Sequence, residues 1–266
     1  MLIIGERING MFKDVRKAIR ERDASAIQQL AQAQVQAGAG ALDVNVGPAS
    51  DDPVGAMKWL VESIRQVTDI PLAIDTTKAD AMRAGLALAG PGSIINSTTG
   101  QQEKLDVLLP MAVEHGAAII GLTIDEKGVP RDETGRVEVA LKIVAAAVEA
   151  GLEPDRVYID AVILPMNCMQ ENPGHVYKTI RECKMLSDPA PKTVIGLSNV
   201  SQGTTKRELV NRTCLVMAIA AGLDAAVADA LDAELMDAMI TADLLLNNQI
   251  YCEDYIVAWH KSHARP

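Results

Sequence analysis

Short apolar runs alternate with longer stretches of helical period along the whole chain. Each run is apolar on both faces, which is typical of parallel strands that are covered by helices. Eight runs of this kind can be counted, and they predict strands at Leu2–Ile8, Ala41–Gly47, Pro71–Thr77, Ser93–Thr99, Ala118–Ile124, Val157–Leu164, Thr193–Val200 and Ala225–Ala230. The pattern therefore predicts a parallel sheet in which strands and helices alternate.

Segments with a helical spacing of apolar residues fill the intervals between these strands. They predict helices at Asp14–Ala37, Pro53–Val67, Lys78–Leu88, Leu105–His115, Val137–Ala150, Pro173–Leu186, Lys206–Ala221 and Ala233–Asn247. Glycines such as Gly90 and Gly116 follow several of them, where the C-cap of a helix is expected. The segment Tyr251–Pro266 predicts one more helix or a cap on the fold.

Eight strand–helix units in 266 residues leave about 33 residues for each unit. That count and spacing predict an α/β fold of the (β/α)₈ TIM-barrel type. The alternative is an open, doubly wound sheet, but no GxGxxG motif follows the first strand to support a dinucleotide-binding fold. No linker rich in Pro, Ser or Gly divides the chain, so we expect residues 1–266 to form a single domain.

Composition and charge narrow the choice of partner. The net charge is −10 and only 3% of residues are aromatic, so neither a nucleic-acid groove nor an anionic membrane surface is an expected partner. No signal peptide and no apolar run long enough for a membrane span is visible. The 4 cysteines form no CxxC pair. We therefore expect a cytoplasmic protein with reduced thiols and no metal site of its own.

Polar residues occur where seven of the predicted strands end, and this end of a barrel is where catalytic groups lie. They are Glu6, Arg7 and Asn9, then Asp43 and Asn45, Asp75, Asn96, Asp160, Ser198 and Asn199, and Asp229. Buried carboxylates and amides are costly unless they are paired. We therefore expect Asp75, Asn96, Asp160 and Asn199 to face a ligand.

Four of the other polar residues fit a purely structural role as well as a role in a binding site. Glu6 and Arg7 fit an internal ion pair as well as a site, and Asp43 and Asp229 fit loop caps or bonds between strands. Lys206 and Arg207, at the start of the predicted seventh helix, suit an anionic tail better than bulk solvent.

The donors and acceptors around the predicted mouth suit a flat heterocycle better than a phosphate. Phosphate barrels present glycine-rich loops after the last two strands, whereas Asp229 and Asp232 here would repel an anion. A carboxylate such as Asp160 can accept two parallel N–H bonds from an amino-pyrimidine edge. A pterin is one candidate among several.

Motifs along nearly the whole chain resemble the pterin-binding barrel family. They are GERING (5–10), DVNVG (43–47), IDTT (74–77), INSTTG (95–100), IDAVILPM (159–166) and GLSNVSQG (196–203). Within that family they are most similar to the methyltetrahydrofolate:corrinoid/iron–sulfur protein methyltransferases. They also resemble the folate-binding barrel of cobalamin-dependent methionine synthase.

The resemblance implies a role for each matching residue. It places Asp75, Asn96 and Asp160 on the pterin rim and Asn199 near the N5 nitrogen that carries the methyl group. Further folate contacts are implied for Gly196, Ser198, Gln202 and Arg207. Asn199 would donate a hydrogen bond to N5 that strengthens in the transition state, and Asp75 is the expected member of a proton relay.

The reaction implied is transfer of the N5-methyl group of methyltetrahydrofolate to Co(I) of a corrinoid, by SN2-type attack. The corrinoid would be carried by a corrinoid/iron–sulfur protein of the acetyl-CoA (Wood–Ljungdahl) pathway, because this chain has no DxHxxG corrinoid motif. The resemblance also implies a homodimer. Alternatives are a methyltransferase for another methylated pterin, a dihydropteroate synthase, and a non-catalytic folate-binding protein.

Overall fold

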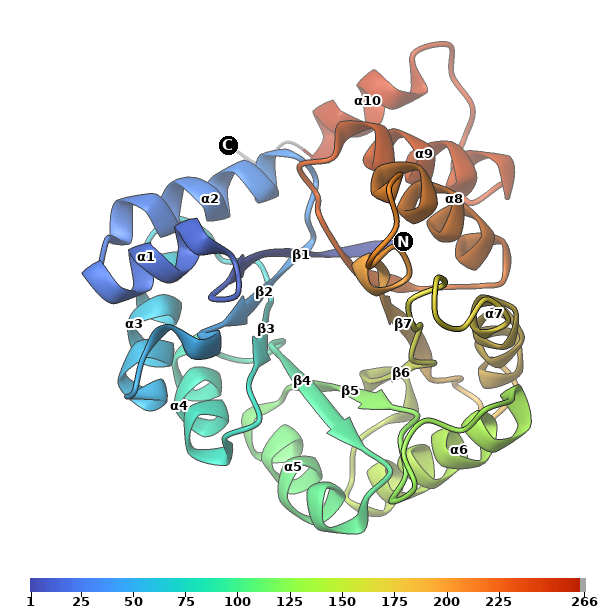
Figure 1. Cartoon of the computed structure of the whole chain (residues 1–266), viewed down its shortest axis with the longest axis horizontal. Helices are drawn as coiled ribbons and strands as arrows, with labels where there is room; N and C mark the ends of the chain where they lie inside the picture. The colour runs from blue at the N-terminus through green and yellow to red at the C-terminus, as the bar shows by residue number, and fades with distance from the viewer. Residues whose placement is uncertain (264–266) are drawn as a thin grey trace.

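Eight parallel strands close into a barrel in which each strand pairs with its neighbours in chain order, and β1 pairs with β8. The computed structural model describes residues 1–263. The strands are β1 (Leu2–Asn9), β2 (Ala41–Asn45), β3 (Leu72–Asp75), β4 (Ile94–Thr99), β5 (Ala118–Leu122), β6 (Val157–Asp160), β7 (Lys192–Gly196) and β8 (Ala225–Ala228). The predicted TIM barrel is confirmed (Figure 1).

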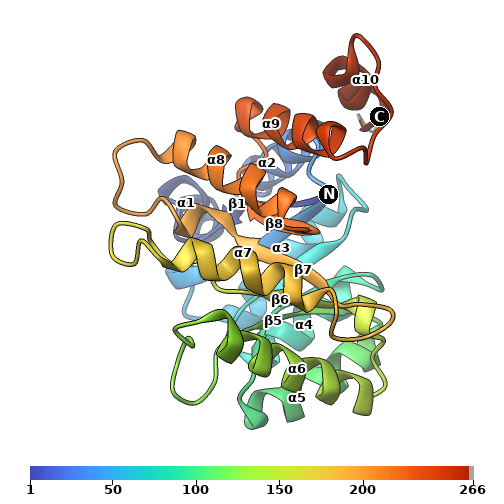
Figure 2. The same ribbon diagram turned by 90° about the vertical axis from the view of Figure 1, so that its right-hand side faces the viewer.

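The helices form a ring outside the strands, as Figure 1 shows. They are α1 (Lys13–Glu21), α2 (Ala24–Gln36), α3 (Pro53–Arg65), α4 (Ala79–Ala89), α5 (Gln102–His115), α6 (Glu133–Glu149), α7 (Asn172–Cys183), α8 (Arg207–Ala220), α9 (Ala233–Leu245) and α10 (Tyr255–His263). The predicted tail helix is α10, which lies beyond α9 at the edge of the molecule (Figure 2), and positions 264–266 of that tail lie outside the described residues. Within residues 1–263, none of the helices has the length and apolar content to cross a membrane.

The single helix predicted over Asp14–Ala37 is wrong, because the chain breaks it into α1 and α2. Arg22 takes the left-handed conformation with φ 55°, and the Asp23 side chain then accepts from the Ala26 amide at 3.1 Å to begin α2. An aspartate cap supplies a partner for an amide that the helix leaves free. A cap can therefore divide a continuous helical period.

The predicted strands of units six and seven are also too long. The strand conformation ends at Asp160 in β6 and at Gly196 in β7, and Leu197–Asn199 form a 3₁₀ turn (η3). The polar residues that follow therefore lie on loops above the barrel.

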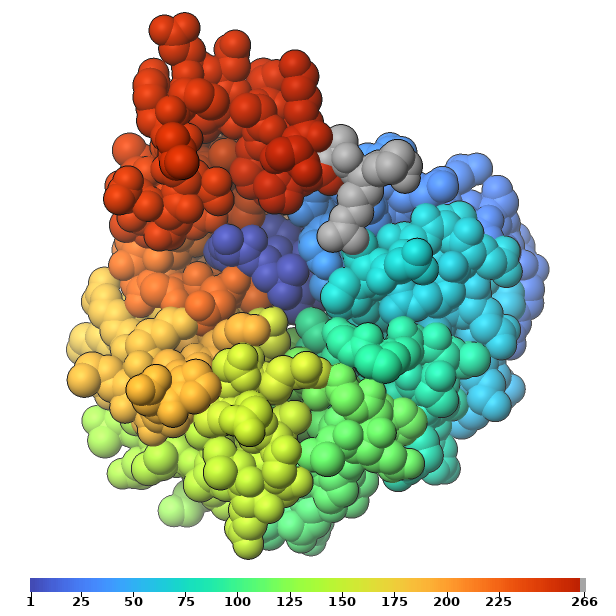
Figure 3. Space-filling view, turned by 180° about the vertical axis from the view of Figure 1, so that it is seen from behind, coloured from blue at the N-terminus to red at the C-terminus, as the bar shows by residue number. Residues whose placement is uncertain are grey.

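The barrel interior below its mouth is filled with aliphatic side chains and one tyrosine. The inward cluster comprises Ile4, Ala41, Ala73, Ile94, Ala118, Ile120, Tyr158, Val194 and Ala225. Seen from behind in Figure 3, the first residues of the chain lie in the middle of the ring. The packed interior blocks the barrel axis, so a ligand can enter only at the mouth.

A bulge in β1 changes which side chains face the mouth. Gly5 is opposite Leu42 and Ile8 is opposite Val44, so β1 has one more residue than β2 across this interval. Gln34 of α2, fully buried, accepts from the Arg7 amide at 3.1 Å, which satisfies a donor that the bulge frees. Because a bulge shifts the alternation of a strand, residues three apart can face the same side.

Candidate functional site

A cavity of about 920 Å³ occupies the mouth of the barrel at the carboxyl ends of the strands. The eight residues predicted from the sequence all line it, namely Asp75, Asn96, Asp160, Gly196, Ser198, Asn199, Gln202 and Arg207. The fold thus brings together residues that are up to 132 positions apart in the chain. Their roles toward a ligand stay predictions.

Two carboxylates at the base of this mouth cavity are each held by an asparagine. Asn96 donates to Asp43 Oδ1 at 2.9 Å, and Asn45 donates to Asp75 Oδ2. Asp43 is only 2% exposed, and burial together with the charge of Asp75 raises its pKa well above the ordinary range. Burial also raises the pKa of Asp75. These two groups therefore retain protons more readily than exposed aspartates do.

Asp160 ends β6 and faces the same cavity. Burial raises the pKa of its carboxyl from the ordinary 3.8 to about 6, against the opposing effects of the Val162 amide, the Arg136 guanidinium and the Gly196 amide. The Val162 amide donates to Asp160 Oδ1 at 2.7 Å. At neutral pH the Asp160 carboxyl is mainly ionised and keeps free acceptor positions for a ligand.

Asn199 lies in the η3 turn that follows β7, the strand that pairs with β6. Its side chain is exposed, and its amide forms no hydrogen bond with another side chain or backbone group in residues 1–263. A side chain at Gly196 would place its Cβ only 2.9 Å from Asn199 Nδ2. Glycine at position 196 therefore leaves room for the Asn199 amide at the cavity wall.

The ion pair considered for Glu6 and Arg7 does not form. Ser198 donates to Glu6 Oε1 at 2.6 Å, whereas Arg7 pairs with Asp14 at 2.9 Å. Burial raises the pKa of Glu6. Glu6 therefore joins the acidic wall of the mouth cavity, and Arg7 supports the loop after β1.

Of the two adjacent basic residues, only Arg207 lines the mouth cavity. Its Nη2 donates to the Ser198 carbonyl and its Nε donates to Ser201 Oγ, both at 3.2 Å. Lys206 is exposed and is not among the residues that line the cavity, and its contact with an anionic tail stays a prediction. Asp229 lines the cavity and also caps its loop by accepting from the Leu231 amide at 3.0 Å.

The sequence reasoning missed an apolar lip on the cavity. Met11 and Phe12, on the loop between β1 and α1, line the mouth, and the Arg7 guanidinium lies 4.0 Å from the centre of the Phe12 ring. The sequence contains 1 phenylalanine, Phe12, and it follows closely after the end of the first predicted strand. That position could have indicated that Phe12 lies at the mouth of the barrel. Asn211 of α8 was also missed, because a polar residue on a helix gives no such signal.

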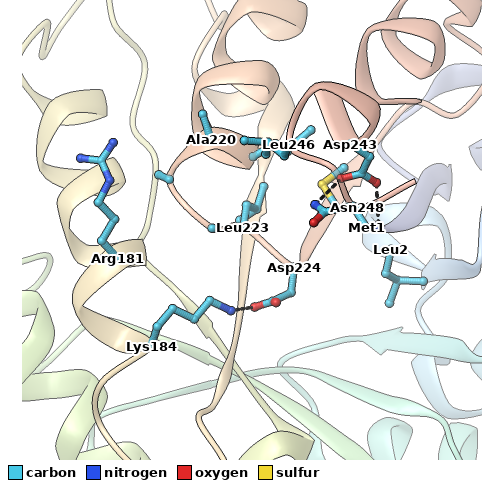
Figure 4. A pocket seen from close by; sticks show the side chains of 13 residues that line it. Met1, Leu2, Arg181, Lys184, Ala220, Leu223, Asp224, Asp243, Leu246 and Asn248 are labelled. Atoms are coloured by element: carbon cyan, nitrogen blue, oxygen red, sulfur yellow. Dashed lines mark hydrogen bonds and ion pairs between the residues drawn. The ribbon is translucent and has the colours of Figure 1, made fainter. Parts of the chain in front are cut away.

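A second hollow of about 860 Å³ lies at the opposite end of the barrel (Figure 4). Four of its charged groups form two ion pairs: the Met1 amino group pairs with Asp243 at 3.0 Å, and Lys184 pairs with Asp224. Arg181 also lines this hollow. Among residues 1–263, no three His, Cys, Asp or Glu side chains are grouped so as to hold a metal ion.

The chain belongs to the pterin-binding enzyme family: the family described as "Pterin binding enzyme" matches residues 9–229. The resemblance inferred from the six motifs is confirmed. Methylcorrinoid:tetrahydrofolate methyltransferase of Eubacterium limosum is 31% identical over 271 residues, which cover 100% of this chain and 98% of that protein. Methionine synthase of Mycobacterium leprae is 31% identical over 243 residues, which cover 86% of this chain but only 20% of that longer protein.

Solved structures with a similar fold include dihydropteroate synthases. A dihydropteroate synthetase with bound product has a TM-score of 0.70 and 18% identity, covering 92% of this chain and 94% of that chain. The Yersinia pestis enzyme with a pterine–sulfa conjugate has a TM-score of 0.68, also at 18% identity, with the same coverage. At this identity the likeness shows the fold alone.

Proposed function

We propose that this enzyme transfers a methyl group between N5 of tetrahydrofolate and the cobalt of a corrinoid that a partner protein carries. The observation that carries the proposal is the arrangement of the mouth cavity. Carboxylates and amides line its base, and the unpaired Asn199 amide lies on its wall. The full-length similarity to a methylcorrinoid:tetrahydrofolate methyltransferase supports the same assignment.

The hydrogen bonds at the cavity base define what a pterin would meet. Asn45 occupies one oxygen of Asp75, and Asp43 occupies the amide nitrogen of Asn96. The second oxygen of Asp75 and the carbonyl oxygen of Asn96 are left as acceptors. Together with ionised Asp160, they favour a ring edge that is rich in N–H donors, as the aminopyrimidine edge of a pterin is.

Asn199 is the group proposed to act at N5. A tertiary amine is a poor leaving group, so the methyl–nitrogen bond breaks readily only if N5 is protonated or strongly hydrogen-bonded. The amide of Asn199 does not supply a proton at neutral pH, but it can donate a hydrogen bond that strengthens as charge develops on N5. In this proposal, Asp75 takes part in the proton relay.

The same groups serve either direction of transfer. The sequence motifs favour methyltetrahydrofolate as donor, whereas the name of the Eubacterium limosum relative gives a methylcorrinoid as donor and tetrahydrofolate as acceptor. A catalyst lowers the barrier equally in both directions, so the supply of donor and acceptor sets the net flow. The supporting features do not distinguish the directions, and the proposal covers both.

We further propose that the corrinoid is a substrate carried by a corrinoid/iron–sulfur protein that acts in acetyl-CoA synthesis. The homodimer and the cytoplasmic location likewise stay predictions. Arg207 and Gln202 line the cavity and are proposed to contact the folate tail, so a methylated pterin with another tail would meet these two residues differently.

Methyl transfer from methyltetrahydrofolate to free Co(I) cobalamin, followed by visible absorbance, tests the proposal. We expect rapid formation of methylcobalamin by the wild type. The Asn199→Ala variant should transfer at least ~100-fold more slowly with folate binding reduced by less than ~10-fold. The matched control is Asn248→Ala, at the opposite end of the barrel.

Equal losses of rate and affinity in Asn199→Ala would contradict the role given to its amide. Tight folate binding without transfer, even with a corrinoid protein supplied, would favour the non-catalytic folate-binding protein instead. Absence of folate binding would overturn the substrate assignment.

A further inference from the structure

The backbone that follows Asp160 is strained. Val162 has φ 56°, in the left-handed region that a β-branched residue rarely adopts. The amide of this same residue donates to Asp160 Oδ1 at 2.7 Å. The direction of the Asp160 carboxylate therefore depends on a peptide that surrounding groups must hold in place.

Two buried polar side chains from flanking helices hold this loop. Arg136, in the first turn of α6, is 1% exposed and donates from Nη1 to the Ala161 carbonyl at 2.8 Å. Asn172, which begins α7, is also 1% exposed and accepts from the Leu164 amide at 2.8 Å. Neither side chain lines the mouth cavity, so their contact with the site runs through the loop.

A guanidinium at position 136 is unfavourable on local grounds. Burial lowers the pKa of Arg136, and the first turn of a helix is the positive end of its dipole. Within residues 1–263 no carboxylate pairs with it directly, and its Nε donates to the neutral Pro130 carbonyl at 3.1 Å. Filling this volume does not require a charge, since an apolar side chain of similar length would do so at lower cost.

We propose that Arg136 is a positioning residue that holds the Ala161–Val162 peptide, while Asn172 holds the Leu164 amide further along the loop, so that the Asp160 carboxylate stays directed at the pterin edge. The identity of the ligand as a pterin rests on the proposed function, whereas the role of Arg136 in holding the loop does not. The charge of Arg136 also opposes the effect of burial on the pKa of Asp160.

The charged groups around this pair are few. Asp132 and Glu133, at the start of α6, act on Arg136 together with Asp160. Glu133 is itself bound to Lys178 and His175 of α7. Besides Arg136, the groups that act on Asp160 are the backbone amides of Val162 and Gly196, which are uncharged hydrogen-bond donors.

The test compares Arg136→Met, Arg136→Lys and a matched control in the full chain. The control is Arg65→Met, because half-buried Arg65 also donates to backbone carbonyls (Ile70 and Ala89, both at 2.7 Å), but at the amino end of the barrel. The ligand-free protein is labelled with ¹³C-aspartate, and the Asp160 carboxyl signal, assigned with Asp160→Asn, is titrated. Hydrogen exchange of the Val162 and Leu164 amides is measured on the same proteins.

In Arg136→Met we expect the Asp160 carboxyl to titrate about one pH unit higher and the two loop amides to exchange at least ~10-fold faster. Arg136→Lys keeps the charge but not the planar fork, so exchange should rise with a smaller titration shift. Tetrahydrofolate binding should weaken about 10-fold in both variants. The pH below which binding weakens further should rise more in Arg136→Met than in Arg136→Lys. Arg65→Met should change none of these readouts.

A strain-relieving background separates positioning from general destabilisation. Val162→Gly removes the conformational penalty, so adding Arg136→Lys to it should accelerate exchange of the Leu164 amide less than the same change does in the wild type. Unchanged titration and exchange in Arg136→Met would overturn the inference. If wild-type protein fails to bind tetrahydrofolate, the proposed function fails, while the titration and exchange still decide the role of Arg136.

Discussion

Asp160 should destabilise the ligand-free fold at neutral pH, and removing its charge should reveal the cost. Its pKa is about 6 in the folded chain, against an ordinary 3.8 that applies after unfolding. Between these values the folded state binds more protons than the unfolded state, so stability falls as pH rises through this window. One pKa unit corresponds to about 1.36 kcal/mol, and the full shift therefore amounts to roughly 3 kcal/mol above pH 7.

The perturbation is Asp160→Asn, which keeps an oxygen to accept from the Val162 amide. We expect this variant to be more stable than the wild type by about 1–3 kcal/mol at pH 7.5, a rise in Tm of roughly 3–8 °C for a chain of this size. The gain should fall to about half at pH 5, because the wild-type carboxyl is then mostly protonated when folded.

The assay is thermal unfolding of both proteins between pH 5 and pH 8 without ligand. Tetrahydrofolate binding is measured in parallel, and it should be at least ~10-fold weaker in Asp160→Asn. Wild-type binding should itself weaken about 10-fold from pH 8 to pH 5, as only about a tenth of a group with pKa 6 is ionised there. A lower Tm than wild type at pH 7.5, or a pH-independent difference, would refute the reasoning.

Three further changes test other parts of the site. Gln34→Leu leaves the Arg7 amide without its buried acceptor and should destabilise the fold by about 1–3 kcal/mol in urea unfolding, whereas unaltered stability would show that the bulge does not need this bond. Asn45→Ala removes the donor to Asp75 and should raise the pKa of that carboxyl, seen as an upward shift of the acid limb of methyl transfer; an unmoved limb would exclude Asp75 from the relay. Phe12→Ala should raise the KM for folate or for the corrinoid protein several-fold with little change in stability, because the ring lies at the open mouth, and wild-type kinetics would remove it from the site.

Much of the fold follows from the sequence because each unit is specified locally. Apolar runs at regular intervals, such as Ala118–Leu122, and helices closed by glycine, such as Gly116 after α5, repeat along the chain. A closed barrel of eight parallel strands accommodates eight repeats of this kind in chain order. Errors arose where a cap overrides the period, as Asp23 does between α1 and α2.

The sequence alone determined that the polar residues at the strand ends would gather at the mouth, because the carboxyl ends of parallel strands meet on one side of a barrel. Only the tertiary structure decided which of them are paired and which are free. Glu6 binds Ser198 rather than Arg7, and Asn45 and Asp43 occupy part of the hydrogen-bonding capacity of the residues beside them. Buried Arg136 behind Asp160 was equally invisible in the sequence, since pairing and burial depend on distances between strands and helices that are far apart in the chain.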